Sequence, residues 1–128
     1  EMGPNLILHG HRSKQFATSA LYSANILLNI SNNTIAQAPS KILEYVGTCK
    51  PIINIYTVND DVCQSYLENY PLSISIQEDY GKIDQLASEI QQFIMENTGK
   101  RCEFDKVMAL YENFSPEKFA EGLLELIT

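Results

Sequence analysis

The chain has 128 residues, of which 45% are hydrophobic and 20% are charged, and its formal net charge is −7. This length and hydrophobic content suit one domain with one core. The negative charge argues against a general nucleic-acid-binding or anionic-membrane-binding surface, for which a basic stripe is expected. A local phosphate site remains compatible with that charge, because one lysine and a few backbone N–H groups are enough to hold a phosphate.

The three cysteines, Cys49, Cys63 and Cys102, are an odd number without CxxC spacing. They therefore predict neither a disulfide framework nor a zinc site, and reduced thiols in a cytoplasmic protein are expected. No apolar run reaches the roughly 18 residues that a membrane span requires. The opening Glu1–Pro4 leads almost at once into an apolar run, so we expect the chain to be a fragment of a longer protein.

The first elements predicted along the chain alternate between strand and helix. The apolar run Asn5–His9 predicts a strand, and Ser13 is expected to cap a helix over Gln15–Ser23. Asn25–Ile30 is almost continuously aliphatic, which predicts a strand buried on both faces, as in a parallel sheet. A polar loop over Ser31–Ala38 follows.

The central segment predicts a helix and then a strand. The helix over Pro39–Val46 begins at a proline, which suits the first turn, and Gly47 is expected to be its C-cap. Its buried side is expected to consist of four residues, Ile42, Leu43, Tyr45 and Val46. The next strand is predicted over Pro51–Tyr56.

The remainder of the chain predicts one more strand and mostly helices. Asp60 or Asp61 can cap a helix that runs to about Asn69, and Leu72–Ile76 is a strand whose alternating serines indicate one exposed face or a sheet edge. Three further helices are predicted, over Lys82–Asn97, over Phe104–Tyr111 and from Pro116 onward. This order predicts a single α/β domain over 1–128, with a short parallel sheet of about four strands and helices on both faces.

The helix that begins near Pro39 carries the main candidate site. Lys41 and Glu44 are three residues apart and share one helix face, so Lys41 can contact a phosphate while Glu44 accepts hydrogen bonds from sugar hydroxyls. The alternative is a solvated i,i+3 ion pair without a ligand. Ser40 either caps the helix or contacts a phosphate. The preceding loop adds five hydrogen-bonding side chains at the carboxyl end of a strand, where α/β proteins bind ligands: Ser31, Asn32, Asn33, Thr34 and Gln37.

Two other polar clusters also follow predicted strands. In the segment His9–Arg12, either Arg12 or His11 holds a phosphate, or the segment is a plain polar loop. Two histidines without a neighbouring carboxylate or cysteine do not indicate a metal site. Glu78 and Asp79 are either a catalytic carboxylate pair or a solvated turn, and adjacent residues favour the turn because they seldom point the same way.

Three segments, Ala24–Ile30, Pro39–Tyr45 and Gly47–Ile53, together resemble the C-terminal domain of GT-B glycosyltransferases of the family 4-like kind. The resemblance implies a Rossmann-like three-layer α/β/α fold that binds a nucleotide-sugar donor. Ser40 and Lys41 then lie at the diphosphate, and Glu44 binds the ribose hydroxyls. The loop that contains Asn32, Asn33 and Thr34 faces the donor sugar, and Gly10 lies near the nucleotide.

This resemblance implies transfer of a sugar from a UDP- or GDP-sugar, as substrate rather than cofactor, in bacterial-type polysaccharide or glycoconjugate synthesis. Many relatives carry a Glu-x7-Glu pair, whose first position falls on Ala36 here. The family's N-terminal acceptor domain and first β/α unit are not in the sequence, so we expect no transferase activity and weak donor binding from this chain alone. The alternative function is a non-catalytic α/β regulatory or protein-interaction module. An exposed strand edge also predicts a possible homodimer.

Overall fold

A three-stranded parallel sheet forms the centre of the chain. The computed structural model describes residues 5–31 and 40–127. Its strands lie in the order β1 (Leu27–Ile30), β2 (Ile52–Tyr56) and β3 (Ser73–Gln77), and all neighbours are parallel. The predicted α/β class is confirmed, but the sheet of the described residues has three strands where four were expected.

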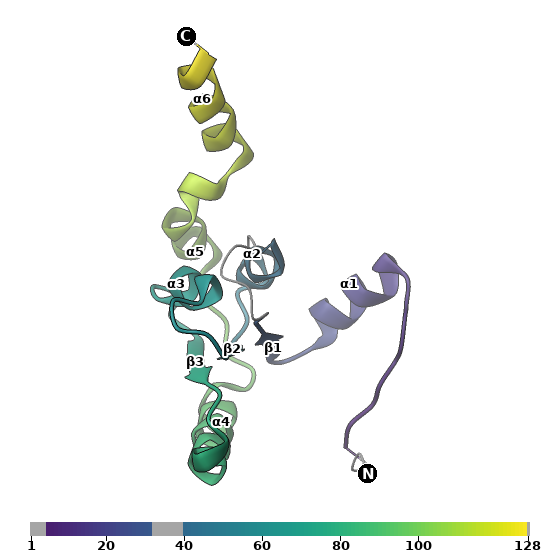
Figure 1. The fold of residues 1–128 in the computed structure, drawn as a ribbon. Coiled ribbons are helices and arrows are strands. Elements are labelled where there is room, and N and C mark those ends of the chain that lie inside the picture. The colour runs from purple at the N-terminus through teal and green to yellow at the C-terminus, as the bar shows by residue number, and fades with distance from the viewer. Residues whose placement is uncertain (1–4, 32–39, 128) are drawn as a thin grey trace.

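Helices lie on both sides of this sheet (Figure 1). The crossover helices α2 (Ser40–Gly47) and α3 (Val62–Leu67) cover one face together with α5 (Phe104–Leu110), and α4 (Ile83–Asn97) lies on the opposite side. Right-handed crossovers place successive helices on the same face when strands are added in one direction, which explains why α2 and α3 are neighbours. The chain ends in α6 (Pro116–Ile127).

The core lies between the sheet and the α2–α3–α5 side. Leu27 and Ile52 are paired across β1 and β2 and are buried against Ile42 and Val46 of α2 and Val107 of α5. Leu43 and Tyr45 are half-buried, so the predicted buried side of α2 is confirmed. On the other sheet face Ile53 and Ile76 are buried, but at the β1 edge Leu28 is 51% and Ile30 is 69% exposed.

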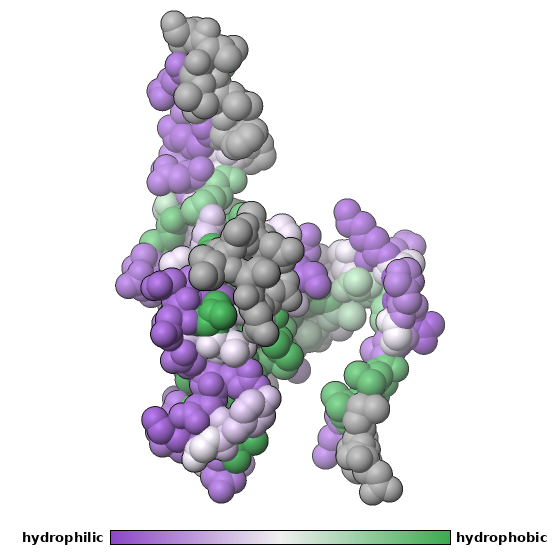
Figure 2. Space-filling model, viewed as in Figure 1, coloured by the Kyte–Doolittle hydropathy of each residue, from purple (hydrophilic) through white to green (hydrophobic). Residues whose placement is uncertain are grey.

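The predicted strand at Asn5–His9 is wrong. These residues have no ladder partner in the part of the chain that the structure describes, and Leu6, Ile7 and Leu8 are 57%, 72% and 68% exposed. Figure 2 shows the resulting apolar surface on the N-terminal segment. A strand needs a neighbour for its backbone N–H and C=O groups, and the segment extends away from the sheet in Figure 1. The helix that follows, α1 (Lys14–Ser23), is confirmed, and the Ser13 hydroxyl accepts the cap hydrogen bond from the Phe16 N–H at 3.2 Å.

Lys50 attaches α1 to the sheet. Its side chain is only 4% exposed, and its ammonium donates to the backbone carbonyl of Leu21 at 2.7 Å and also to that of Tyr22. These carbonyls belong to the last turn of α1, which lacks intrahelical donors and carries the negative end of the helix dipole. The Lys50 Nζ also lies 5.9 Å from the centre of the Tyr22 ring. A single buried cation therefore holds the C-terminal end of α1.

The remaining predictions for the helices are confirmed except in detail. Gly47 is the last residue of α2 rather than its left-handed cap, and Cys49 adopts the positive φ, at 59°. The predicted helix α4 is confirmed, but its described side chains include no buried residue. Asp61 is the N-cap of α3, and its carboxylate accepts from the Gln64 N–H at 2.8 Å.

No described helix combines the length and apolar character of a membrane span.

Candidate functional site

The candidate site is a groove between α1 and α2, beside β1. It has a volume of about 480 Å³, and Lys14, Lys41 and Glu44 are its charged lining residues. The walls are formed by small and aliphatic side chains, which include Ala17, Ala20, Leu21, Ala24 and Leu28. Lys14 and Lys41 belong to the first turns of α1 and α2, and both residues line the groove.

The charges that line this groove form no ion pair among the described residues. The ion pairs of the described residues join Lys82 to Asp79, Lys106 to Glu103 and Lys118 to Glu121, and none involves the groove's lysines or Glu44. The predicted alternative for the Lys41 and Glu44 side chains, a mutual ion pair, is therefore not observed.

Tyr45 forms part of the wall beside Glu44. Burial raises the pKa of the Tyr45 hydroxyl, and the negative charge of Glu44 raises it further. The neutral hydroxyl is therefore the form present near neutral pH, and it can donate a hydrogen bond. The groove thus combines two cations, one carboxylate and one phenol on a largely apolar wall.

The other predicted site residues that the structure describes, Ser40 and Gly10, do not line the groove. Ser40 is the exposed first residue of α2. Asn32, Asn33, Thr34 and the remainder of the loop to Pro39 lie outside the described residues. Gly10 has a φ of 66° in open space ahead of α1 and is not among the groove's lining residues, so its role at a nucleotide remains a prediction.

The polar residues ahead of α1 have a local partner. The His9 ring packs edge-on against Phe16, with 5.2 Å between the ring centres, and the Arg12 guanidinium lies 5.4 Å from the centre of the same Phe16 ring. These contacts favour the plain-loop interpretation. No group of three or more His, Cys, Asp or Glu side chains that could hold a metal occurs among the residues described.

Glu78 and Asp79 make the contacts of a turn. The Glu78 carboxylate accepts from the Thr57 hydroxyl at 3.2 Å. The Asp79 carboxylate accepts from the Gly81 N–H at 2.9 Å and lies 3.8 Å from the Lys82 ammonium, so it caps the short 3-10 helix Tyr80–Lys82. The solvated turn is the interpretation that these contacts support.

A buried polar network beneath the carboxyl end of the sheet was not predicted. Asn54 of β2 has an exposure of 0%, and its Oδ1 accepts from the Asn29 Nδ2 at 2.7 Å and the Ser31 hydroxyl at 3.1 Å. Its Nδ2 donates to the Asp61 Oδ2 and the Ser75 Oγ, both at 3.4 Å. Asn29, Asn54 and Ser75 occupy matching register positions on the three strands. The sequence signal was an asparagine inside each of two otherwise aliphatic strands.

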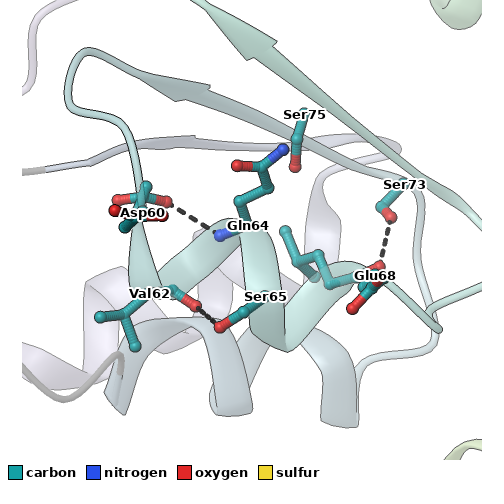
Figure 3. A pocket seen from close by; sticks show the side chains of 9 residues that line it. Asp60, Val62, Gln64, Ser65, Glu68, Ser73 and Ser75 are labelled. Carbon is teal, nitrogen blue, oxygen red and sulfur yellow. Dashed lines mark hydrogen bonds between the residues drawn. The ribbon is translucent and has the colours of Figure 1, made fainter.

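The Asn54 network includes Ser31, where the predicted ligand loop begins, and Ser75, which lines a second hollow. The second hollow, of about 560 Å³, lies between α3 and β3 and is lined by Asp60, Glu68, Ser73 and Ser75 among others. Figure 3 shows Gln64 pointing across it toward Ser75. Because its lining has carboxylates and no lysine or arginine, it does not suit a phosphate. Of these two hollows, the groove between α1 and α2 is therefore the better candidate for an anionic ligand.

We compared the chain with protein-family models, curated proteins and solved structures, and none of the three comparisons gave a match.

Proposed function

We propose that this chain is the donor-binding part of a nucleotide-sugar-dependent glycosyltransferase with a Rossmann-like donor domain. The observation that carries the proposal is that Lys41 and Glu44 line one groove, unpaired with each other, together with Lys14. In this assignment the ammonium of Lys41 binds the diphosphate and the carboxylate of Glu44 accepts hydrogen bonds from the ribose hydroxyls. Lys14 of α1 adds a second cation beside the phosphates.

The chemistry of the groove suits these binding roles. A diphosphate carries negative charge that the two lysines can neutralise. A ribose offers two hydroxyl donors to a carboxylate, and its carbon atoms can pack on the apolar wall of α1. A transferase stabilises the diphosphate as it leaves, so cations at this position also serve the reaction. The acceptor site belongs to the rest of the proposed two-domain enzyme.

NMR titrations with UDP, GDP and UDP-glucose test this assignment. We expect chemical shift changes at Ser40–Glu44 and at Lys14, at ligand concentrations up to millimolar. Lys41→Ala removes one charge-assisted contact, which corresponds to about 1.5–3 kcal/mol and hence to roughly 10- to 100-fold weaker UDP binding. Glu44→Ala is expected to weaken UDP binding through the ribose. Lys118→Ala and Glu121→Ala change an exposed Lys–Glu pair with the same i,i+3 spacing on α6 and serve as matched controls.

Ligand analogues separate the two roles. Lys41→Ala should reduce the preference for UDP over uridine, whereas Glu44→Ala should reduce the preference for UDP over its 2′-deoxy analogue. If both variants lose affinity equally for every analogue, the assigned contacts are wrong. Shift changes that appear only outside the groove would overturn the site itself.

A second candidate, a non-catalytic protein-interaction module, is favoured by one observation. Leu6, Ile7, Leu8, Leu28 and Ile30 are all more than half exposed, which is much apolar surface for a chain of this size. The homodimer expected through a strand edge would use β1, the end strand that carries the last two of these residues. Gel filtration that shows only monomer would argue against that dimer.

A further inference from the structure

Two cysteines that are distant in the sequence lie side by side in the fold. Cys49 follows α2, Cys102 lies in the connection between α4 and α5, and the Cys102 N–H donates to the Cys49 carbonyl at 2.9 Å. Backbone dimensions then limit the separation of the two Cα atoms to about 7 Å, and any bend shortens it into the range of roughly 4.4–6.8 Å that a disulfide spans. Both thiols are free in the structure.

The surroundings of the two thiols differ. Cys49 is buried, whereas Cys102 is half-buried and lines a hollow of about 410 Å³. Lys100, Arg101 and Lys106 contribute three cations to the same hollow, against one carboxylate, that of Glu103. Lys106 pairs with Glu103 at 3.0 Å, so the excess positive charge comes from Lys100 and Arg101. In a chain with a net charge of −7 this is a local positive site, of the kind that attracts anions.

The pKa of the buried Cys49 thiol depends on its burial and on its neighbours. Burial raises the pKa of the Cys49 thiol, the neighbouring Cys102 raises it further, and Arg101 partly lowers it. Tyr70, whose hydroxyl donates to the Lys50 carbonyl at 2.7 Å, has its pKa raised by burial and also by hydrogen bonding to Cys102. The accessible thiol is therefore the one suited to react first, and the protected thiol lies next to it.

We propose that Cys102 and Cys49 form a thiol pair that reacts with small anionic disulfides, with Cys102 as the attacking residue and Cys49 as the resolving residue. The Cys102 thiolate attacks one sulfur of the small disulfide, the disulfide bond breaks, and one small thiol leaves with the proton that Cys102 released. The Cys49 thiolate then attacks the Cys102 sulfur, forms the Cys49–Cys102 bond and releases the second small thiol. The protein loses two electrons and two protons, and the small disulfide gains them.

Cys63 provides an internal control for this chemistry. It lies at the start of α3, where its thiol interacts with Ser31 and Asn29, and burial raises its pKa. It does not line the basic hollow. A reaction guided by the positive hollow should therefore leave Cys63 reduced.

The first test treats the reduced wild-type chain with oxidised glutathione under native conditions, followed by alkylation, chymotryptic digestion and mass spectrometry. Chymotrypsin can cut at Tyr56, between Cys49 and Cys63, whereas trypsin leaves them in one peptide because Lys50 precedes a proline. We expect a cross-link between the Cys49 and Cys102 peptides and an alkylated Cys63. A cross-link that involves Cys63, or no oxidation of the folded chain, would overturn the proposal.

Two further measurements test which thiol attacks, which thiol resolves the mixed disulfide, and whether the charge of the hollow sets the rate. Cys49→Ser should trap one glutathione on Cys102, and Cys102→Ser, which changes the more exposed residue, should leave Cys49 unmodified. Oxidised glutathione should react on the order of tenfold faster than the neutral 2-hydroxyethyl disulfide, and Arg101→Ala should reduce that ratio. Equal rates for the two disulfides would exclude the basic hollow as the determinant, and a glutathione adduct on Cys49 in Cys102→Ser would reverse the assigned order.

Discussion

Replacing Lys50 with methionine should detach α1 from the sheet while leaving the core intact. The variant keeps an unbranched side chain of similar length and removes only the ammonium that donates to the carbonyls of Leu21 and Tyr22. α1 has no buried residue of its own, so these two bonds and the contacts of half-buried Leu21 and Ala24 with the core are what hold it. The loss should therefore be local.

The magnitude follows from the two hydrogen bonds. Bonds from a charged donor contribute about 1.5–3 kcal/mol each, and we take the lower value because the freed carbonyls of an exposed helix can be hydrated. Burial lowers the pKa of Lys50, and the nearby Arg101 lowers it further, so the folded state bears a cost for holding the ammonium there. Allowing about 1 kcal/mol for that cost leaves about 2 kcal/mol, which is roughly a 30-fold shift in the docking equilibrium of α1.

Hydrogen exchange measures this shift directly. Amides in α1 should exchange roughly 30-fold faster in Lys50→Met, whereas β2 amides such as that of Ile52, which donates to the Leu72 carbonyl at 2.8 Å, should change much less. Lys100→Met is the matched control, because Lys100 is exposed and its ammonium makes only a 3.4 Å contact with Asn97. Unchanged exchange in α1 of Lys50→Met would refute the reasoning, and equal acceleration in every element would show that Lys50 supports the whole core instead.

Two further outcomes can be measured in solution. Asn54→Ala should lower the free energy of unfolding, measured in urea titrations, by about 2–4 kcal/mol. The variant removes the acceptor of the 2.7 and 3.1 Å bonds from Asn29 and Ser31. The control Asn69→Ala, at an exposed site, should change the free energy of unfolding by less than about 0.5 kcal/mol. The free energy of unfolding should also fall as the pH rises above about 9. Burial raises the pKa of the Cys49 thiol and raises the pKa of Tyr111 to about 12. The folded state therefore keeps protons that the unfolded state releases near pH 8.5 and pH 10. The lowered pKa of Lys50 acts in the opposite sense, and a flat urea midpoint from pH 8 to 11 would contradict this balance.

The local pattern of the sequence was enough for most elements, because each depends on neighbouring residues. The aliphatic run of β2 and the apolar spacing of α4 predicted their type and approximate extent. The caps were local too, since Ser13 and Asp61 accept hydrogen bonds from N–H groups three residues ahead. The alternation of serines with isoleucines in β3 predicted either an exposed face or a sheet edge, and β3 is an end strand of the described sheet.

Only the tertiary structure decided what depends on a distant partner. Asn5–His9 has the composition of a strand, but a strand exists only where another strand offers hydrogen bonds, and none pairs with it among the described residues. Lys41 and Glu44 are adjacent on α2 by helical spacing alone, yet their groove exists because Lys50 and the core contacts of Leu21 and Ala24 hold α1 beside them. Local sequence specifies which residues share a helix face or a strand, and the contacts between distant elements, such as that between Cys49 and Cys102, decide which of those faces form a site.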